Sequence, residues 1–205
     1  MGLRDKFFFS SLYLLRMNSD CPRYDLPDGY TIHKLVDKDI QIVAAVHRSE
    51  EIVEQRIERE DIAYWIRHND ACINIQWYSI RDYYVWDIRS MVSFPHGASY
   101  LYDGFTDPAY RGKGLNKGAL SRLIFDAGLL SKGPIFSLTQ KSNPMGWGFL
   151  ERFGFLRTAE ISLLQVPPLR IYTITQHDVV NRHVVFMKVR TEPLRIDLDS
   201  IRIVN

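Results

Sequence analysis

The pattern of apolar and polar positions predicts strands and helices in a mixed order along the chain. Alternation with a period of two, bounded by turn residues, predicts strands, whereas apolar residues three and four positions apart predict amphipathic helices. Strands are expected at residues 30–36, 71–78, 83–92, 99–106, 135–139, 157–166, 171–175 and 184–189. Helices are expected behind Asp37, from Ser49 to Ile66, behind Gly114 and behind Asn143. The order, with no internal repeat or linker, predicts a single α+β domain over residues 29–190.

Two of the expected helices have clear apolar faces. The first places Ile40, Val43, Ala44 and His47 at helical spacing, and the second places Val53, Ile57, Ile62, Trp65 and Ile66 roughly on one side. We expect these helices to flank a mixed, mostly antiparallel central sheet.

Both ends of the chain carry apolar residues outside this domain. Residues 7–15 follow a charged start and superficially resemble a secretory leader, but serines interrupt the short run and no small-residue cleavage site precedes Cys21. We therefore expect residues 1–28 to be an N-terminal extension whose helix covers the core or a partner subunit. Residues 191–205 alternate apolar and charged positions, which predicts an edge strand or a tail on a neighbouring subunit. No stretch approaches the roughly 20 apolar residues of a membrane span.

The composition limits the partners more than the fold. The 205 residues are 46% hydrophobic and 24% charged, which is typical of a folded domain and not of a disordered one. Lys and Arg number 26 against 24 Asp and Glu, a net charge of +2, so no nucleic-acid partner is indicated. Two cysteines, Cys21 and Cys72, cannot build a disulfide framework or a four-thiolate zinc site, which is typical of a reducing compartment, so we expect a cytoplasmic protein.

The segment that carries chemistry is the loop between the strand at 99–106 and the helix behind Gly114. Gly112 and Gly114 would let the main chain approach an anion at the positive end of that helix, and Arg111, Lys113 and Lys117 add positive charge. Such a loop suits a phosphate group. A glycine-rich turn without a ligand is the alternative that Gly-x-Gly alone leaves open.

Two segments together resemble the GNAT superfamily of acyl-CoA dependent N-acetyltransferases. Residues 106–115, Thr-Asp-Pro-Ala-Tyr-Arg-Gly-Lys-Gly-Leu, are similar to that family's signature Val-x-Pro-x-x-Arg-Gly-x-Gly-Ile. Asn143 then opens a helix that ends in Leu-Glu-Arg-Phe-Gly-Phe at residues 150–155, the expected place for the family's second element. The resemblance implies a GNAT-like fold that transfers an acetyl group from acetyl-CoA to a primary amine of a small molecule, with no metal and no covalent enzyme intermediate.

The resemblance also assigns cofactor contacts. Main-chain amides of residues 111–116 would hold the pyrophosphate, and the main chain near Phe105 would bind the pantetheine and the acyl carbonyl. Splayed parallel strands ending at Thr106 and Thr139 would admit the pantetheine arm, which Asn143 would touch from the far side. The assigned residues are Phe105, Thr106, Arg111, Gly112, Lys113, Gly114, Leu115, Asn116, Lys117 and Asn143.

Two positions depart from the family pattern. Asn116 stands where the family often has glycine or alanine, so its side chain must turn away or donate to phosphate. Leu150 stands where the family often has the tyrosine that protonates the leaving thiolate. These departures favour a rival interpretation, a noncatalytic GNAT-fold module that binds CoA or a protein partner.

Transfer to an amine needs a base, because an amine of lysine type is almost wholly protonated at neutral pH. Asp103 is the expected base, since it lies on the strand near the implied acyl site and burial would raise its pKa. A carboxylate that is hydrogen-bonded to a neighbouring loop is the alternative. Tyr100 and Tyr102 share the strand and could line an acceptor pocket or belong to the core.

Other groups point to no chemistry of their own. His177, Asp178 and His183 have a spacing that fits no common metal site, so no metal is expected. The aromatic group between Trp77 and Trp86 is expected partly in the core and partly around an acceptor cleft or a contact in a homodimer.

Overall fold

The computed structural model describes residues 7–17, 21–126, 128–166, 169–177, 182–188 and 194–199. Their contacts group into two compact units: unit 1 comprises the described residues within 1–17, 81–96 and 136–205, and unit 2 comprises those within 18–80 and 97–135. The N-terminal strand and the segment around residue 90 both pair with strands from the C-terminal part, which brings them into unit 1. The single domain expected over 29–190 stays a prediction.

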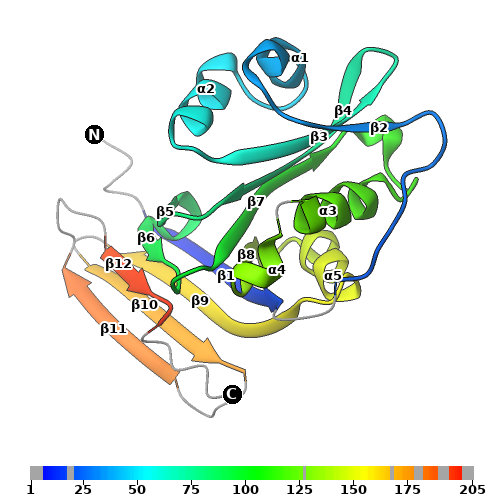
Figure 1. Ribbon diagram of the computed structural model, residues 1–205. Helices are drawn as coiled ribbons and strands as arrows, with labels where there is room; N and C mark the ends of the chain where they lie inside the picture. Colours follow the sequence, from blue (N-terminus) through cyan, green and yellow to red (C-terminus); the bar gives the residue numbers. More distant parts are fainter. Residues whose placement is uncertain are drawn as a thin grey trace. The chain divides into compact units, whose positions relative to one another are not determined.

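Unit 2 contains a sheet with the strand order β7-β4-β3-β2, in which neighbouring strands run antiparallel. Its elements are β2 (Thr31–Lys34), η2 (Asp37–Asp39), α1 (Ile40–Ala44), α2 (Glu50–Glu58), β3 (Ile62–His68), β4 (Ala71–Ser79), β7 (Ser99–Thr106), η4 (Pro108–Tyr110), α3 (Leu115–Asp126) and α4 (Leu129–Lys132). Within this unit α1 and α2 lie on one side of the sheet and α3 on the other (Figure 1).

The packing of unit 2 fixes the start of α3. Ile66 and Ile73 of the sheet pack against Leu115 and Ala119 of α3, and all four side chains are buried. Farther along α3, a Cβ on Gly118 would lie 2.6 Å from the Leu26 side chain, so the segment before β2 runs closely along the helix. The loop that precedes α3 is thus attached to a well-packed helix.

The helix expected from Ser49 to Ile66 is too long. α2 ends at Glu58, Glu60 has a φ of 64°, and Ile62 to His68 form the strand β3. β3 pairs with β2 on one side and β4 on the other and is buried on both faces over Ala63–Ile66. A strand buried on both faces does not alternate, so its apolar run is hard to distinguish from a helix by periodicity.

Unit 1 contains a sheet with the strand order β11-β10-β9-β1-β8 and a three-stranded sheet with the order β12-β6-β5. Its elements are β1 (Phe8–Met17), β5 (Tyr83–Val85), η3 (Trp86–Ile88), β6 (Ser90–Ser93), β8 (Ile135–Gln140), α5 (Pro144–Arg152), β9 (Leu156–Val166), β10 (Leu169–Gln176), β11 (Arg182–Lys188) and β12 (Leu194–Asp197). The pairs β1–β9, β9–β10 and β10–β11 are antiparallel, and β12 runs parallel to β6.

The helix expected in the N-terminal extension is wrong. Residues 8–17 form the strand β1, which pairs with β9 along its length, with Leu12 opposite Ile161. Leu12 to Leu15 are buried, because β1 is an interior strand with both faces covered. Residues 1–6 of the expected extension lie outside the described part of the chain.

Two further expectations fall in unit 1. The strand expected over 83–92 is broken by η3 and by Arg89, which has a φ of 49°. Within the described part of the C-terminal segment, β12 is an edge strand of the small sheet, which is one of the two expected alternatives.

The fold class is confirmed as mixed α+β with mostly antiparallel strands flanked by helices. No helix among the described residues has both the length and the apolar character needed to cross a membrane.

Candidate active site

The candidate site begins where β7 ends at Thr106. The Asp107 carboxylate accepts a hydrogen bond from the Ala109 amide at 2.9 Å and starts the short turn η4. The chain then passes Gly112 and Gly114, whose φ angles are 78° and 77°. Only glycine adopts this left-handed region without strain, which explains both residues. A Cβ at either position would have no heavy atom within 4 Å, so the main chain there is open to a ligand.

The loop presents a group of hydrogen-bond donors at the start of α3. The amides of Lys117 and Gly118 donate to Gly114 O at 3.0 and 3.2 Å, which closes the first helical turn. The amides of residues 112–116 donate to no other group in the described part of the chain. Such donors, next to the positive end of a helix, form a site that suits a phosphate group.

Three cationic side chains border the loop. Arg111 Nε donates to Thr106 O at 3.1 Å, which ties the loop back to the end of β7. Lys113 Nζ lies 4.8 Å from the Tyr110 ring centroid, and Lys117 Nζ lies 5.0 Å from the Tyr24 ring centroid. The loop therefore combines open amides with positive charge, as an anion site requires.

A buried amide network, which no sequence pattern predicts, connects β4 to the site. Asn74 is fully buried, and its Nδ2 lies 2.9 Å from Phe105 O, 2.7 Å from Thr106 Oγ1 and 3.1 Å from Asn116 Oδ1. Gln76 Nε2 also donates to Asn116 Oδ1. Asn116 therefore turns its carbonyl oxygen toward β4, which is one of the two behaviours expected of it. No local signal marks Asn74, because its partners are more than 30 residues away in sequence.

The strand β7 is irregular beside this network. Trp77 pairs with Tyr102 and Ile75 with Phe105, so Asp103 and Gly104 together lie opposite the single residue Gln76. This is a β-bulge, and Asp103 has the left-handed φ of 48° that such an extra residue adopts. A Cβ on Gly104 would lie 2.5 Å from Gln76 Oε1, so a larger residue there would displace the Gln76 side chain.

The bulge directs Asp103 into a cluster of basic side chains. Arg48 contacts both carboxylate oxygens, with Nε 2.9 Å from Oδ2 and Nη2 2.5 Å from Oδ1. Arg56 Nη2 lies 2.6 Å from Oδ2, and His47 Nε2 lies 3.1 Å from Oδ1. Burial acts to raise the pKa of Asp103, but the bonds to His47, Arg48 and Arg56 outweigh it and hold the pKa far below its usual range.

The raised pKa expected for Asp103 is therefore wrong. The expectation assumed that burial acts on an isolated carboxylate. In the structure two guanidinium groups and an imidazole surround this carboxylate. A carboxylate so strongly ionised is a poor proton acceptor. The alternative, a carboxylate bonded to a neighbouring loop, describes the contacts to His47 and Arg48.

His47 joins this cluster to the implied acyl site. It lies between α1 and α2, and its ring stacks on Phe105 with a centroid distance of 4.4 Å and an interplanar angle of 15°. The helical spacing predicts only that His47 lies on a helix face. Its proximity to Asp103 arises from tertiary packing over more than 50 residues, for which the sequence gives no local signal.

The two tyrosines of β7 belong to the core. Tyr100 and Tyr102 are buried and stack with a centroid distance of 5.6 Å. The Tyr102 hydroxyl donates to Asp61 Oδ2 at 2.8 Å. This contact favours a structural role over a place in an acceptor pocket.

Three other positions with an expected role, Thr139, Asn143 and Leu150, lie in unit 1. Asn143 caps α5, where its Oδ1 accepts from the Gly146 amide at 3.0 Å. Leu150 is a buried residue of α5 and has no proton to donate. The expected contact of Asn143 with pantetheine, and the splay of the strands ending at Thr106 and Thr139, stay predictions.

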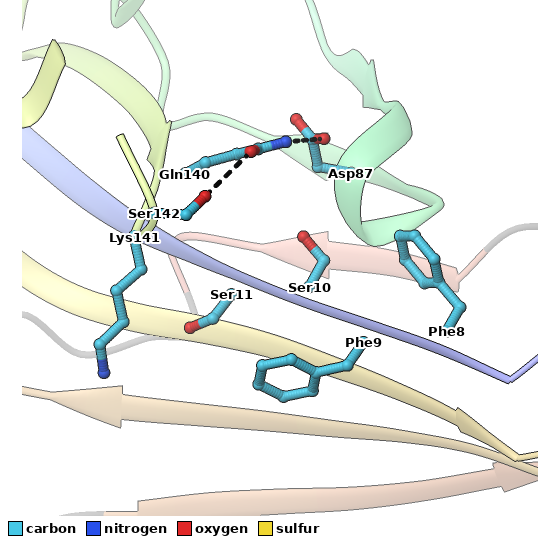
Figure 2. A pocket seen from close by; sticks show the side chains of 8 residues that line it. All are labelled: Phe8, Phe9, Ser10, Ser11, Asp87, Gln140, Lys141 and Ser142. Carbon is cyan, nitrogen blue, oxygen red and sulfur yellow. Dashed lines mark hydrogen bonds between the residues drawn. The ribbon is translucent and has the colours of Figure 1, made fainter. Parts of the chain in front are cut away.

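Two cavities lie outside these residues. Figure 2 shows the one in unit 1, of about 460 Å³, where Gln140 Nε2 donates to Asp87 Oδ1 at 2.6 Å. It is lined by Phe8, Phe9, Ser10, Ser11, Asp87, Gln140, Lys141 and Ser142. The cavity in unit 2, of about 330 Å³, lies beside α3 and is lined by Arg23, Tyr24, Asp25, Ser121, Arg122, Phe125 and Asp126. No residue expected to bind the cofactor or act as base lines either cavity.

Comparison with solved structures places this geometry in a known fold. A putative acetyltransferase of the GNAT family from Novosphingobium aromaticivorans matches with a TM-score of 0.58 and 17% identity, covering 78% of this chain and 65% of that one. A tandem GNAT protein from the clavulanic acid biosynthesis pathway matches with a TM-score of 0.55 and 11% identity, covering 73% and 50%. A GCN5-related N-acetyltransferase from Kribbella flavida matches with a TM-score of 0.53 and 14% identity, covering 78% and 60%.

These likenesses show that the chain has the GNAT fold, which confirms the resemblance at the level of fold. The chain spans between half and two thirds of the length of these structures. No protein-family model and no curated protein sequence matches it.

Proposed function

We propose that the chain is an N-acyltransferase that moves an acetyl group from acetyl-CoA to a primary amine of a small molecule by direct attack in a ternary complex. The observation that carries the proposal is the loop at residues 111–116, where Gly112 and Gly114 leave the main chain open beside a group of donor amides. A GNAT fold that carries this loop supports acetyl-CoA as the ligand.

The proposed reaction needs little from the protein beyond placement and charge stabilisation. The loop would fix the pyrophosphate of acetyl-CoA, with Asn143 contacting the pantetheine arm. The main chain near Phe105 and Thr106 would bind the acyl carbonyl. Holding both reactants side by side supplies proximity, and donors aimed at the carbonyl oxygen stabilise the developing negative charge.

One experiment separates the proposal from its rivals. Isothermal titration with acetyl-CoA measures binding, and thiol release with a panel of amino acids, amino sugars and polyamines measures transfer. Binding with thiol release supports the enzyme. Absence of binding contradicts the assignment of the loop.

A noncatalytic module that binds CoA is the second candidate. It is favoured by Leu150, which cannot protonate a leaving thiolate, and by the ion pairs that occupy Asp103. Binding of acetyl-CoA without thiol release to any amine would favour this module over the enzyme.

A cytoplasmic location is part of the proposal. Cys21 and Cys72 are both free thiols, and burial raises their pKa values to about 11 and about 12. Unreactive, unpaired thiols suit a reducing compartment.

A further inference from the structure

Asp103 is a poor candidate for the group that takes the proton from the acceptor amine. The side chains of Arg48, Arg56 and His47 contact its carboxylate oxygens and keep the carboxylate ionised. Arginine stays protonated in proteins, so neither guanidinium can accept a proton. The only proton acceptor in the cluster is the imidazole.

We propose that His47 is the general base of the transfer and that Asp103 is its positioning residue. The inference rests on the proposed function. His47 Nε2 is buried, makes no hydrogen bond to another described group, and lies 3.1 Å from Asp103 Oδ1, its ion-pair partner. A neutral imidazole that keeps its proton on Nε2, facing this carboxylate, carries its acceptor lone pair on Nδ1. His47 Nδ1 makes no hydrogen bond to any described residue.

The surroundings fix the orientation of this ring. Phe105 stacks on one face at 4.4 Å, and the Phe105 carbonyl is itself held by Asn74 Nδ2 at 2.9 Å. The base is thereby anchored to the strand that is proposed to hold the acyl carbonyl. A base, an acidic partner that orients it, and a nearby acyl site are the three components that proton transfer in an acyl-transfer site requires.

The two arginines have a specific part in this arrangement. Arg56 is buried and lies over Trp77, with Cζ 4.9 Å from the ring centroid, and Arg48 grips both carboxylate oxygens. They keep Asp103 ionised, so it orients the imidazole and does not take the proton from it. Among the described residues, the one ion pair of His47 is with Asp103, which both arginines also contact.

The acceptor enters as an ammonium group, and one of its protons passes to His47 Nδ1, which frees the lone pair on the nitrogen. The nitrogen then forms a bond to the thioester carbon. The carbon–sulfur bond breaks, its electron pair leaves with the sulfur, and a second proton of the nitrogen passes to this thiolate. The imidazolium gives its proton to water, which restores the neutral imidazole.

The first test reads the ring itself and needs no substrate. Long-range ¹H–¹⁵N correlation spectra of the full-length wild type report which nitrogen of each histidine carries the proton. We expect His47 to keep its proton on Nε2 in the neutral form, and we expect Asp103→Asn to weaken this preference. A proton on Nδ1 would leave no acceptor toward the substrate and would overturn the proposal.

The second test uses turnover with the amine that gives the fastest thiol release. His47→Gln should lower kcat about 100-fold or more at neutral pH, as loss of a general base does. The loss should shrink at high pH, where free amine is plentiful, and acetyl-CoA affinity should not change. His33→Gln is the matched control, because His33 lies in the same unit, on β2. Its ring is within hydrogen-bonding distance of Thr31 Oγ1 and contacts the Trp65 ring.

Chemical rescue separates a base from a structural histidine. Added imidazole should restore thiol release to His47→Ala, because the lost base is then supplied from solution. A loss of kcat that is the same at every pH and does not respond to imidazole would overturn the proposal, as would full activity of His47→Gln. If the variants do not fold, the spectra of the wild type decide. A wild type that binds acetyl-CoA but transfers to no amine overturns the proposed enzyme and this inference together, whereas active variants overturn the inference alone.

Discussion

At the scale of single residues, the ion pairs of Asp103 make the stability of the protein depend on pH. The pKa of Asp103 is lower in the folded state than in the unfolded chain, so the carboxylate binds protons less readily when the protein is folded. Its contribution to stability is therefore fully present above the unfolded-state pKa of about 4 and is lost as the pH falls below that value.

Asp103→Asn tests this dependence. The substitution should lower the free energy of unfolding by about 2–3 kcal/mol at pH 7, because it leaves Arg56 largely buried without its anion. The difference from wild type should narrow from about pH 4 downward. Urea unfolding between pH 3 and pH 7 measures both effects.

The control is an ion pair on the surface. Asp70 pairs with Arg67, but its side chain is 83% exposed, so Asp70→Asn should change stability by less than about 1 kcal/mol. A loss for Asp103→Asn that is equally small, or independent of pH, would contradict the strong pairing of this carboxylate.

Asn74 is the second residue whose substitution should change both the stability of the protein and the candidate site. Asn74→Ala should lower the free energy of unfolding by about 2–3 kcal/mol, because it removes the side-chain donor to the Phe105 carbonyl and one of the two donors to Asn116 Oδ1. It should also weaken acetyl-CoA binding, because Asn116 lies in the first turn of α3, directly after the loop. Urea unfolding and isothermal titration measure these effects, and stability unchanged from wild type would show that the network is not formed.

At the scale of elements, the loop before α3 should bind acetyl-CoA through its main chain. Gly114→Val places a side chain where the amides must meet phosphate, so acetyl-CoA affinity should fall at least about tenfold, the equivalent of 1.4 kcal/mol. The left-handed φ of 77° adds a backbone strain of about 1–2 kcal/mol to the folded state. Isothermal titration measures the affinity, and thermal unfolding measures the strain.

Gly29→Val is the matched control for this strain. Gly29 has a φ of 85° and open space around its Cβ, as Gly114 does, but it lies in the turn before β2. Its substitution should lower stability by a similar amount and leave the affinity for acetyl-CoA unchanged. Equal affinity for wild type and Gly114→Val would refute the assignment of the loop to phosphate.

The elements also show which parts of the site were readable from the sequence. The loop was predictable because the features that indicate it lie close together in the sequence. Two glycines, a turn and the start of a helix fall within ten residues. β1 and β3 were mistaken for helical segments because strands buried on both faces lose the alternation that identifies them. The contacts of Asp103 with His47 and Arg56 could not be read, because a bulge and tertiary packing bring residues about 50 positions apart together.

At the scale of the whole molecule, unit 1 depends on pairing between strands that are far apart in the sequence, β1 and β9. Ser11 in β1 and Glu160 in β9 are 149 residues apart, yet Ser11 Oγ donates to Glu160 Oε1 at 2.7 Å. Pairing over such a separation pays a large loop-closure entropy before any contact compensates for it. The apolar residues of β1 must therefore supply much of the stability of unit 1.

Leu14→Ala tests this role of β1. Leu14 is fully buried on a strand with neighbours β9 and β8, so its truncation should lower the free energy of unfolding by about 3 kcal/mol. Phe9→Ala on the same strand is the control: its side chain is 61% exposed, and the loss should stay below about 1 kcal/mol. Urea unfolding gives both values, and hydrogen exchange should show the largest loss of protection in β1 and β9. Similar losses for the two variants would mean that residues 8–17 do not form an interior strand, and the strand order of unit 1 would then have to be redrawn.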